Sequence, residues 1–161
     1  MDRHYLVFGA SGYIGGNLVP MLAQRGVRVR AAARNRQVME ARGWDRVDIV
    51  EADALAPDTL PAALADIDVA FYLVHSMASG SSFGALDLEA ASNFAGAAAA
   101  AGIRRIVYLG GLVPEDSGGG EHISSRRDTG EVLREGTVPV TELRAGIIIG
   151  PGSAAFEVMR D

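Results

Sequence analysis

Three glycines near the amino terminus have the spacing of a turn that binds an anion through the backbone. Gly9, Gly12 and Gly15 directly follow an apolar run at residues 5–8, and a helix-compatible segment continues over residues 17–24. A strand, a tight turn and a helix start, in this order, gather free backbone N–H groups and the positive end of a helix dipole at one point, where a phosphate binds. We expect Gly9 to allow the turn, Gly12 to admit a pyrophosphate, and Gly15 to let helix and strand pack closely.

The surroundings of this triplet are those that a dinucleotide-binding turn requires. A second apolar run at residues 27–33 completes a short strand–helix–strand unit. The spacing is GxxGxxG, not GxGxxG, because Ser11 stands one place before the middle glycine. A glycine-rich turn that binds nothing is the alternative. The pattern predicts a dinucleotide cradle made by Gly9, Ser11, Gly12, Tyr13, Ile14 and Gly15.

The residues after the second apolar run indicate which dinucleotide binds. In folds of this kind, the end of the second strand faces the adenosine ribose, where a carboxylate bonds the 2′-hydroxyl and an arginine accepts a 2′-phosphate. This chain has Arg34 there, with Arg36 close behind and no carboxylate until Glu40. Guanidinium suits phosphate through paired, charge-assisted hydrogen bonds. We therefore predict NADP(H) as the preferred cofactor and NAD(H) as the second choice; a solvated strand-end arginine is the alternative.

Two further strand ends supply candidate contacts to the cofactor. The run at residues 47–50 leads to Asp53 and Ala54. Asp53 could accept a hydrogen bond from the adenine amino group, with Ala54 packed on the adenine ring, although Asp53 could equally cap the next turn. The run at residues 68–74 is nearly all apolar, as a strand covered on both faces should be. Open α/β sheets bind ligands at the carboxyl ends of their strands. We therefore expect Leu73, Val74 and His75 beside the cofactor, with His75 touching ribose or substrate unless it only satisfies loop hydrogen bonds.

The rest of the chain continues the alternation of strands and helices. Helical patterns cover residues 37–42, 58–65, 83–101 and 121–134, and a loop is expected at residues 114–120. Strand patterns cover residues 104–109 and 138–144, the latter running on to residue 152, and a last helix is expected at residues 154–161. Six strands separated by helical segments predict a doubly wound parallel sheet in one domain.

The composition argues against several other classes of function. The chain has 161 residues and a net charge of −5, with scattered arginines, so no nucleic-acid partner is expected. It contains no cysteine, which excludes disulfides and thiolate chemistry. His4, His75 and His122 lack ligand spacing, so no metal site is expected. The longest alanine-rich segment, residues 94–103, is too short to span a bilayer and no signal peptide is expected, which makes a cytoplasmic location and no membrane partner the default expectation.

Several of these motifs together resemble the atypical short-chain dehydrogenase/reductases, and most closely their NAD(P)H-binding, NmrA-like group. The resemblance rests on residues 9–15, Arg34, Asp53 with Ala54, and residues 101–109. Residues 72–77, 110–112 and 141–152 further resemble a bacterial subgroup in which a C-terminal domain follows the Rossmann part. The resemblance implies a Rossmann domain over residues 1–161, with strand order 3-2-1-4-5-6. It also implies that the substrate-binding segment of such proteins is missing from these residues.

The chain departs from that family at the catalytic positions. Short-chain dehydrogenases use a Tyr-x-x-x-Lys pair, whose tyrosine passes a proton to the substrate oxygen. The matching segment here is His122-Ile-Ser-Ser-Arg126, so His122 is the candidate acid and Arg126 the candidate for orienting the cofactor. Gly110 and Gly111 replace the family's carbonyl-polarising serine and are expected to lie at the cofactor. Tyr108 falls within the fifth strand, outside the pair, and is expected to be packed.

Three functions follow from this resemblance. The first is an NADP-dependent reductase, dehydrogenase or isomerase that transfers hydride between NADP(H) and a small carbonyl or enone. The second, which the missing catalytic residues favour, is a non-catalytic module that senses NADP(H) and signals to a partner. The third is a degenerate scaffold that forms a homodimer through helices 83–101 and 121–135.

Overall fold

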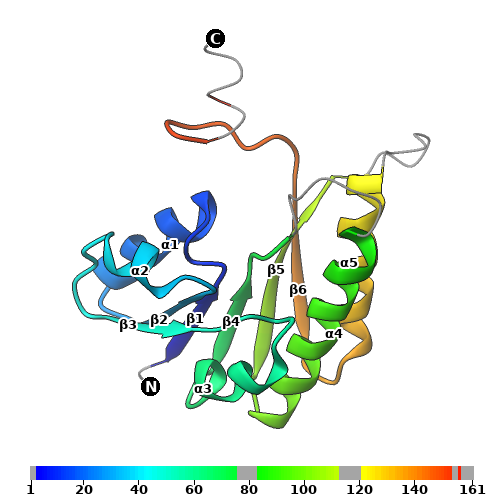
Figure 1. Ribbon diagram of the computed structural model, residues 1–161, viewed down its shortest axis with the longest axis horizontal. Helices are drawn as coiled ribbons and strands as arrows, with labels where there is room; N and C mark the ends of the chain where they lie inside the picture. The colour runs from blue at the N-terminus through cyan, green and yellow to red at the C-terminus, as the bar shows by residue number, and fades with distance from the viewer. Residues whose placement is uncertain (1–2, 76–82, 113–120, 154–155, 157–161) are drawn as a thin grey trace.

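In the computed structural model, which describes residues 3–75, 83–112, 121–153 and 156, six parallel strands form one sheet (Figure 1). For residues 83 and 121–124 only the backbone is described. The strand order β3-β2-β1-β4-β5-β6 confirms the predicted doubly wound topology. The strands are β1 (His4–Phe8), β2 (Arg28–Ala33), β3 (Val47–Glu51), β4 (Val69–Tyr72), β5 (Arg105–Gly111) and β6 (Val140–Ala145).

Helices cover both faces of the sheet because successive strand residues point to opposite sides. On β1, Val7 belongs to the apolar cluster beneath α1 and α2, whereas Leu6 and Phe8 belong to the cluster beneath the other helices. Figure 1 shows α4 and α5 side by side on that second face. The helices are α1 (Tyr13–Gln24), α2 (Arg36–Glu40), the 3-10 helix η1 (Pro57–Thr59), α3 (Leu60–Leu64), α4 (Phe83–Ala100) and α5 (Glu121–Glu135).

Three of the differences from the predicted element boundaries have a clear physical reason. Helix α1 begins at Tyr13, four residues earlier than predicted, because Gly12 already serves as its N-cap. The predicted helix at 58–65 is divided into η1 and α3, each with a proline in its first turn. Strand β6 ends at Ala145, whose carbonyl accepts from the N–H of Leu112. Because β5 ends at Gly111, β6 has no strand to pair with beyond Ala145. The predicted loop at 114–120 and nearly all of the predicted helix at 154–161 lie outside the described residues.

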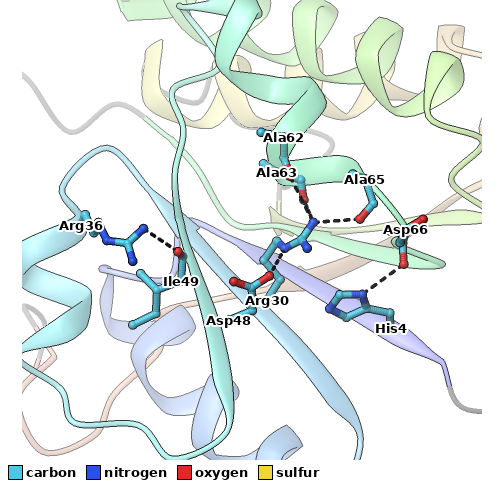
Figure 2. A network of polar contacts seen from close by, with 9 residues as sticks. All are labelled: His4, Arg30, Arg36, Asp48, Ile49, Ala62, Ala63, Ala65 and Asp66. Atoms are coloured by element: carbon cyan, nitrogen blue, oxygen red, sulfur yellow. Dashed lines mark hydrogen bonds and ion pairs between the residues drawn. The ribbon is translucent and has the colours of Figure 1, made fainter.

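A polar network fastens α3 to the sheet on the side away from the strands' carboxyl ends (Figure 2). Arg30 of β2 pairs with Asp48 of β3, with 2.6 Å between Nε and Oδ2, and its Nη1 donates to three carbonyls at the end of α3. His4 donates from Nδ1 to the carbonyl of Asp66 at 3.1 Å, and its own N–H donates to Asp68. A guanidinium at a helix carboxyl end satisfies carbonyls that the helix leaves unpaired. The carbonyls bound by Arg30 belong to Ala62, Ala63 and Ala65.

Candidate cofactor-binding site

The glycine turn joins β1 to α1 with the geometry that an anion cradle needs. Gly9 has φ +96°, a left-handed conformation that favours glycine, and the N–H groups of Gly9 and Ala10 both donate to the carbonyl of Ala32 on β2. Gly12 is the N-cap of α1, which has no side-chain cap and no acidic residue in its first turn. A Cβ on Gly12 would meet only the Gly9 carbonyl oxygen, at 3.4 Å. The first-turn N–H groups therefore remain for an anion in open space.

Gly15 allows α1 to lie directly against the turn. A Cβ at this position would lie 2.5 Å from the carbonyl oxygen of Gly9 and 2.7 Å from the Cα of Ala10. Both are backbone atoms, so neither can rotate away. The close packing expected of this glycine is present, and it sets how far the first turn of α1 stands from the end of β1.

The arginines after β2 differ in their surroundings. Arg36 is engaged within the protein: its Nε donates to Glu40 at 2.7 Å. Its Nη1 donates to the Ile49 carbonyl at 2.9 Å, the contact drawn in Figure 2. Arg34 is exposed, and no contact within the described ranges holds its guanidinium. Arg42, which sequence reasoning did not assign, donates from Nη2 to the Ser11 carbonyl at 3.4 Å. Two guanidinium groups, those of Arg34 and Arg42, thus come from the segment that follows β2.

Arg42 also lies against the first turns of α1. Its Nη1 would be 3.5 Å from a Cβ on Gly16, one residue beyond the glycine triplet. The only sequence signal for this contact was its basic charge at the end of the predicted helix 37–42. That signal does not say which side of the helix the side chain follows, and only the packing of α2 beside α1 brings Arg42 to the turn.

Asp53 makes the turn contact that was one of its two expected roles. Its Oδ1 accepts from the N–H of Leu55 at 3.0 Å, and its own N–H donates to the Thr59 hydroxyl at 3.0 Å. Ala54 is buried, and its carbonyl accepts from the Asn93 side chain of α4 at 2.9 Å. The Asx-type turn bond leaves the second carboxylate oxygen for another donor, so the predicted adenine contact stays a prediction.

The residues after β4 meet the glycine turn at the carboxyl edge of the sheet. The N–H of Leu73 donates to the Phe8 carbonyl at 2.9 Å. A Cβ on Gly9 would lie 3.1 Å from the Leu73 carbonyl and 3.3 Å from a methyl group of Val74. Glycine at position 9 is therefore needed both for its φ and for the close approach of the chain after β4. His75 follows, exposed at the same edge.

The two glycines at the end of β5 make room for charged side chains. A Cβ on Gly110 would lie 2.6 Å from Oε1 of Glu142, which is held through Oε2 by Arg134 at 2.6 Å. A Cβ on Gly111 would lie 3.3 Å from Cδ of Arg126. A larger side chain at either position would have to displace these side chains.

Helix α5 brings Arg126 to the carboxyl edge. Its Nη2 lies 3.2 Å from Nε2 of His75. Tyr108 is buried and donates from its hydroxyl to the Arg126 carbonyl at 2.9 Å, and burial raises the pKa of Tyr108 to about 12. This tyrosine is packed as expected and is a poor proton donor near neutral pH. His122 falls on the backbone of α5, but its side chain lies outside the described residues.

The segment after β6 turns back over the carboxyl edge of the sheet toward α1 (Figure 1). The Tyr13 hydroxyl occupies the position that a Cβ of residue 150 would take, so the tyrosine side chain of α1 packs directly on the backbone of Gly150. The turn is closed by Ser153, a buried hydroxyl that accepts from the N–H groups of Gly150 and Phe156 at 3.1 Å each. Sequence reasoning extended the sixth strand through Gly150 to residue 152 and missed the contact of Gly150 with Tyr13 after the glycine turn.

Comparison with known proteins identifies the family. The family model described as NAD(P)H-binding matches residues 9–145, from the glycine turn to the end of β6. The chain belongs to the NAD(P)H-binding family. The predicted resemblance to an NAD(P)H-binding group is confirmed by this match. The turn at Gly9–Gly15 fits the cofactor because no side chain caps the first turn of α1 and, among the described residues, a Cβ on Gly12 would meet only a backbone oxygen.

Individual relatives agree with this assignment. Cinnamoyl-CoA reductase 1 of Oryza sativa subsp. japonica is 31% identical over 136 residues, which are 80% of this chain and 38% of that protein. Two solved structures share the fold. The triphenylmethane reductase of Citrobacter sp. complexed with NADP(H) has a TM-score of 0.74 at 24% identity, over 89% of this chain and 49% of the other. Bordetella bronchiseptica WbmG in complex with NAD has a TM-score of 0.78 at 18% identity, over 94% and 55%.

The NAD(P)H-binding chain spans only part of these relatives, about half of each solved structure and 38% of the plant reductase. The expectation that a substrate-binding segment follows the sixth strand stays a prediction. Among the helices of the described ranges, none is long and apolar enough to cross a membrane.

Proposed function

We propose that this chain is the cofactor-binding part of an oxidoreductase that uses NADP(H) on a small carbonyl compound or enone. The observation that carries the proposal is the uncapped first turn of α1 behind an open Gly12, within a chain of the NAD(P)H-binding family. A cofactor of this kind donates a hydride to the substrate, or accepts one from it, at the nicotinamide ring. In the reductive direction the hydride adds to the carbonyl carbon while the carbonyl oxygen takes up a proton.

The preference for NADP(H) rests on the guanidinium groups after β2. Arg34 is exposed and held by no contact in the described part of the chain, and Arg42 lies against the glycine turn at Ser11 and Gly16. In folds of this kind the segment after the second strand faces the adenosine ribose, so two guanidinium groups from that segment favour a cofactor with an additional phosphate. The remaining proposed contacts to the cofactor come from the glycine turn and from the ends of β3, β4 and β5: Ser11, Tyr13, Ile14, Asp53, Ala54, Leu73, Val74, Gly110 and Gly111.

In the proposed chemistry, helix α5 supplies two residues: one donates a proton and the other binds and orients. His122 would donate the proton to the substrate oxygen, being one of the few groups that titrate near neutral pH. Arg126 lies at the carboxyl ends of β4 and β5, where related folds place the reacting end of the cofactor. It cannot donate a proton because guanidinium stays charged, so its role is to bind and orient.

Two measurements test the proposal. Calorimetric titration should give a lower Kd for NADP⁺ than for NAD⁺. Oxidation of NADPH, followed by absorbance against a panel of small ketones, aldehydes and enones, should show turnover that His122→Ala reduces strongly. Tight NADP(H) binding with no turnover on any compound would support the sensing module instead. If neither dinucleotide binds the folded protein, the proposed function fails.

We also propose that two copies pair through the α4–α5 face. The two helices lie side by side, and α4 carries exposed small side chains and Leu86, which is 39% exposed. Light scattering should give a dimer mass, and Leu86→Glu should shift it to that of a monomer.

A further inference from the structure

Arg126 is fixed in place by contacts on both sides of its backbone position. The Tyr108 hydroxyl of β5 donates to the Arg126 carbonyl at 2.9 Å. The preceding residue, Ser125, donates from Oγ to Oδ2 of Asp87 on α4 at 3.1 Å, and both residues are buried. Helix α5 therefore cannot slide past β5 or α4 at this point without breaking a hydrogen bond that water does not replace.

The side chain of Arg126 runs from this anchor across the end of β5 to the end of β4. Its Cδ lies over Gly111, where a Cβ would be only 3.3 Å away, and its Nη2 stands 3.2 Å from Nε2 of His75. In the described ranges, no carboxylate lies within ion-pair distance of this guanidinium. Its positive charge thus lies at the carboxyl edge of the sheet, and no anion among the described residues neutralises it.

The contact with Arg126 also specifies the state of the His75 ring. A guanidinium only donates hydrogen bonds, so Nε2 of His75 must accept and cannot carry a hydrogen. The ring is then neutral, with its hydrogen on Nδ1. A neutral imidazole takes one of the five N–H groups of Arg126 and fixes the plane of the fork without cancelling its charge.

We propose that Arg126 binds the substrate oxygen that gains negative charge during reduction, and that His75 is the positioning residue that aims it. This inference rests on the proposed function. The guanidinium donates hydrogen bonds to the oxygen as the carbonyl electron pair moves onto it, and neither gains nor loses a proton. It would replace, by electrostatics, the carbonyl-polarising serine for which Gly110 and Gly111 leave no equivalent.

The first test needs no cofactor and no substrate. Imidazole ¹H–¹⁵N spectra of the uniformly labelled protein, with the His75 signals assigned by their loss in His75→Gln, should show a neutral ring with its hydrogen on Nδ1. In Arg126→Met, which removes the donor but keeps the apolar stem over Gly111, the ¹⁵N shift of His75 Nε2 should change because its hydrogen-bond donor is lost. A His75 Nε2 shift that is the same in both proteins would overturn the pairing. Arg127→Met, on the same helix with 56% of its side chain exposed, is the matched control and should leave the spectrum unchanged.

The second test separates substrate from cofactor. Arg126→Met should lower kcat by about 10²–10³-fold, the usual effect of removing one donor to a developing oxyanion, with the Kd of NADPH unchanged. His75→Leu should lower kcat by up to about 10²-fold through misplacement of the guanidinium, whereas His75→Gln should keep most of the activity because its amide oxygen still accepts. A His75→Leu protein as active as wild type would refute the positioning role, and a raised Kd for NADPH with unchanged kcat in Arg126→Met would assign the guanidinium to a cofactor phosphate instead. If wild type neither binds NADPH nor turns over, the proposed function fails with the role of Arg126, and the spectra alone decide the pairing.

Discussion

Adding one methyl group at Gly15 should destabilise the protein, whereas the same change at the next residue should stabilise it. Both glycines lie in α1, where replacing glycine by alanine alone gains about 0.5–1 kcal/mol. At Gly15, however, the new Cβ would lie 2.5 Å from the Gly9 carbonyl oxygen and 2.7 Å from the Ala10 Cα. Overpacking of this kind costs about 1–3 kcal/mol, and the backbone atoms involved favour the upper part of that range. The net result for Gly15→Ala is a loss of about 1–2 kcal/mol after the helix gain.

Gly16→Ala is the matched control. Its Cβ would meet only the flexible guanidinium of Arg42, at an ordinary contact distance of 3.5 Å. The helix gain should therefore appear undiminished. For a chain of this size, 1 kcal/mol corresponds to about 2–4 °C in Tm, so thermal unfolding should place Gly15→Ala about 2–8 °C below wild type and Gly16→Ala about 1–4 °C above it.

The same pair of variants should differ in cofactor binding. Gly15→Ala must push the first turn of α1 away from the glycine turn, which moves the N–H groups that would hold the diphosphate. Calorimetry should show weaker NADPH binding for Gly15→Ala than for Gly16→Ala. A Gly15→Ala protein with a Tm equal to or above that of Gly16→Ala would refute the packing argument.

Three other predictions follow from particular contacts. Arg34→Ala should raise the Kd of NADP⁺ by about 10–100-fold, the value of a lost charged hydrogen bond of about 1.5–3 kcal/mol, and leave that of NAD⁺ unchanged in a calorimetric titration; equal losses for both dinucleotides would remove the role of Arg34. Arg30→Ala should lower the free energy of unfolding in urea by about 2–3 kcal/mol because it breaks the ion pair with Asp48 and exposes the end of α3, while the exposed Arg28 on the same strand should tolerate alanine within about 0.5 kcal/mol. Burial, then the charges of Arg28 and Arg30, lower the pKa of His4 below its ordinary value. As the pH falls, the unfolded chain therefore binds a proton before the folded chain does, and the free energy of unfolding should decrease below about pH 6.5, the ordinary histidine pKa. His4→Gln should flatten this dependence of the free energy of unfolding on pH, measured in urea between about pH 5 and 7; an unchanged dependence would show that His4 does not cause it.

The local pattern of the sequence was enough for the sheet and for the cradle. Apolar runs bounded by glycine and polar residues are typical of buried strands. Glycines at every third residue directly after such a strand are typical of a turn that binds phosphate. The strand order followed from the family resemblance and is the order observed. Gly15 has the packing role expected of it because the atoms it approaches belong to Gly9 and Ala10, a few residues earlier in the chain. Gly9 has the positive φ that the turn requires, but its close approach to Leu73 and Val74 depends on the tertiary structure.

What the sequence determined by itself is therefore the glycine turn and the alternation of strands with helices that builds the sheet. Only the tertiary structure decided which side chains meet there. Arg42 reaches the turn 31 residues before it, and Arg126 crosses Gly111 to His75, 51 residues away in the chain. Such contacts depend on how helices from distant segments pack on the sheet, and side-chain direction across that distance is not encoded in any local pattern.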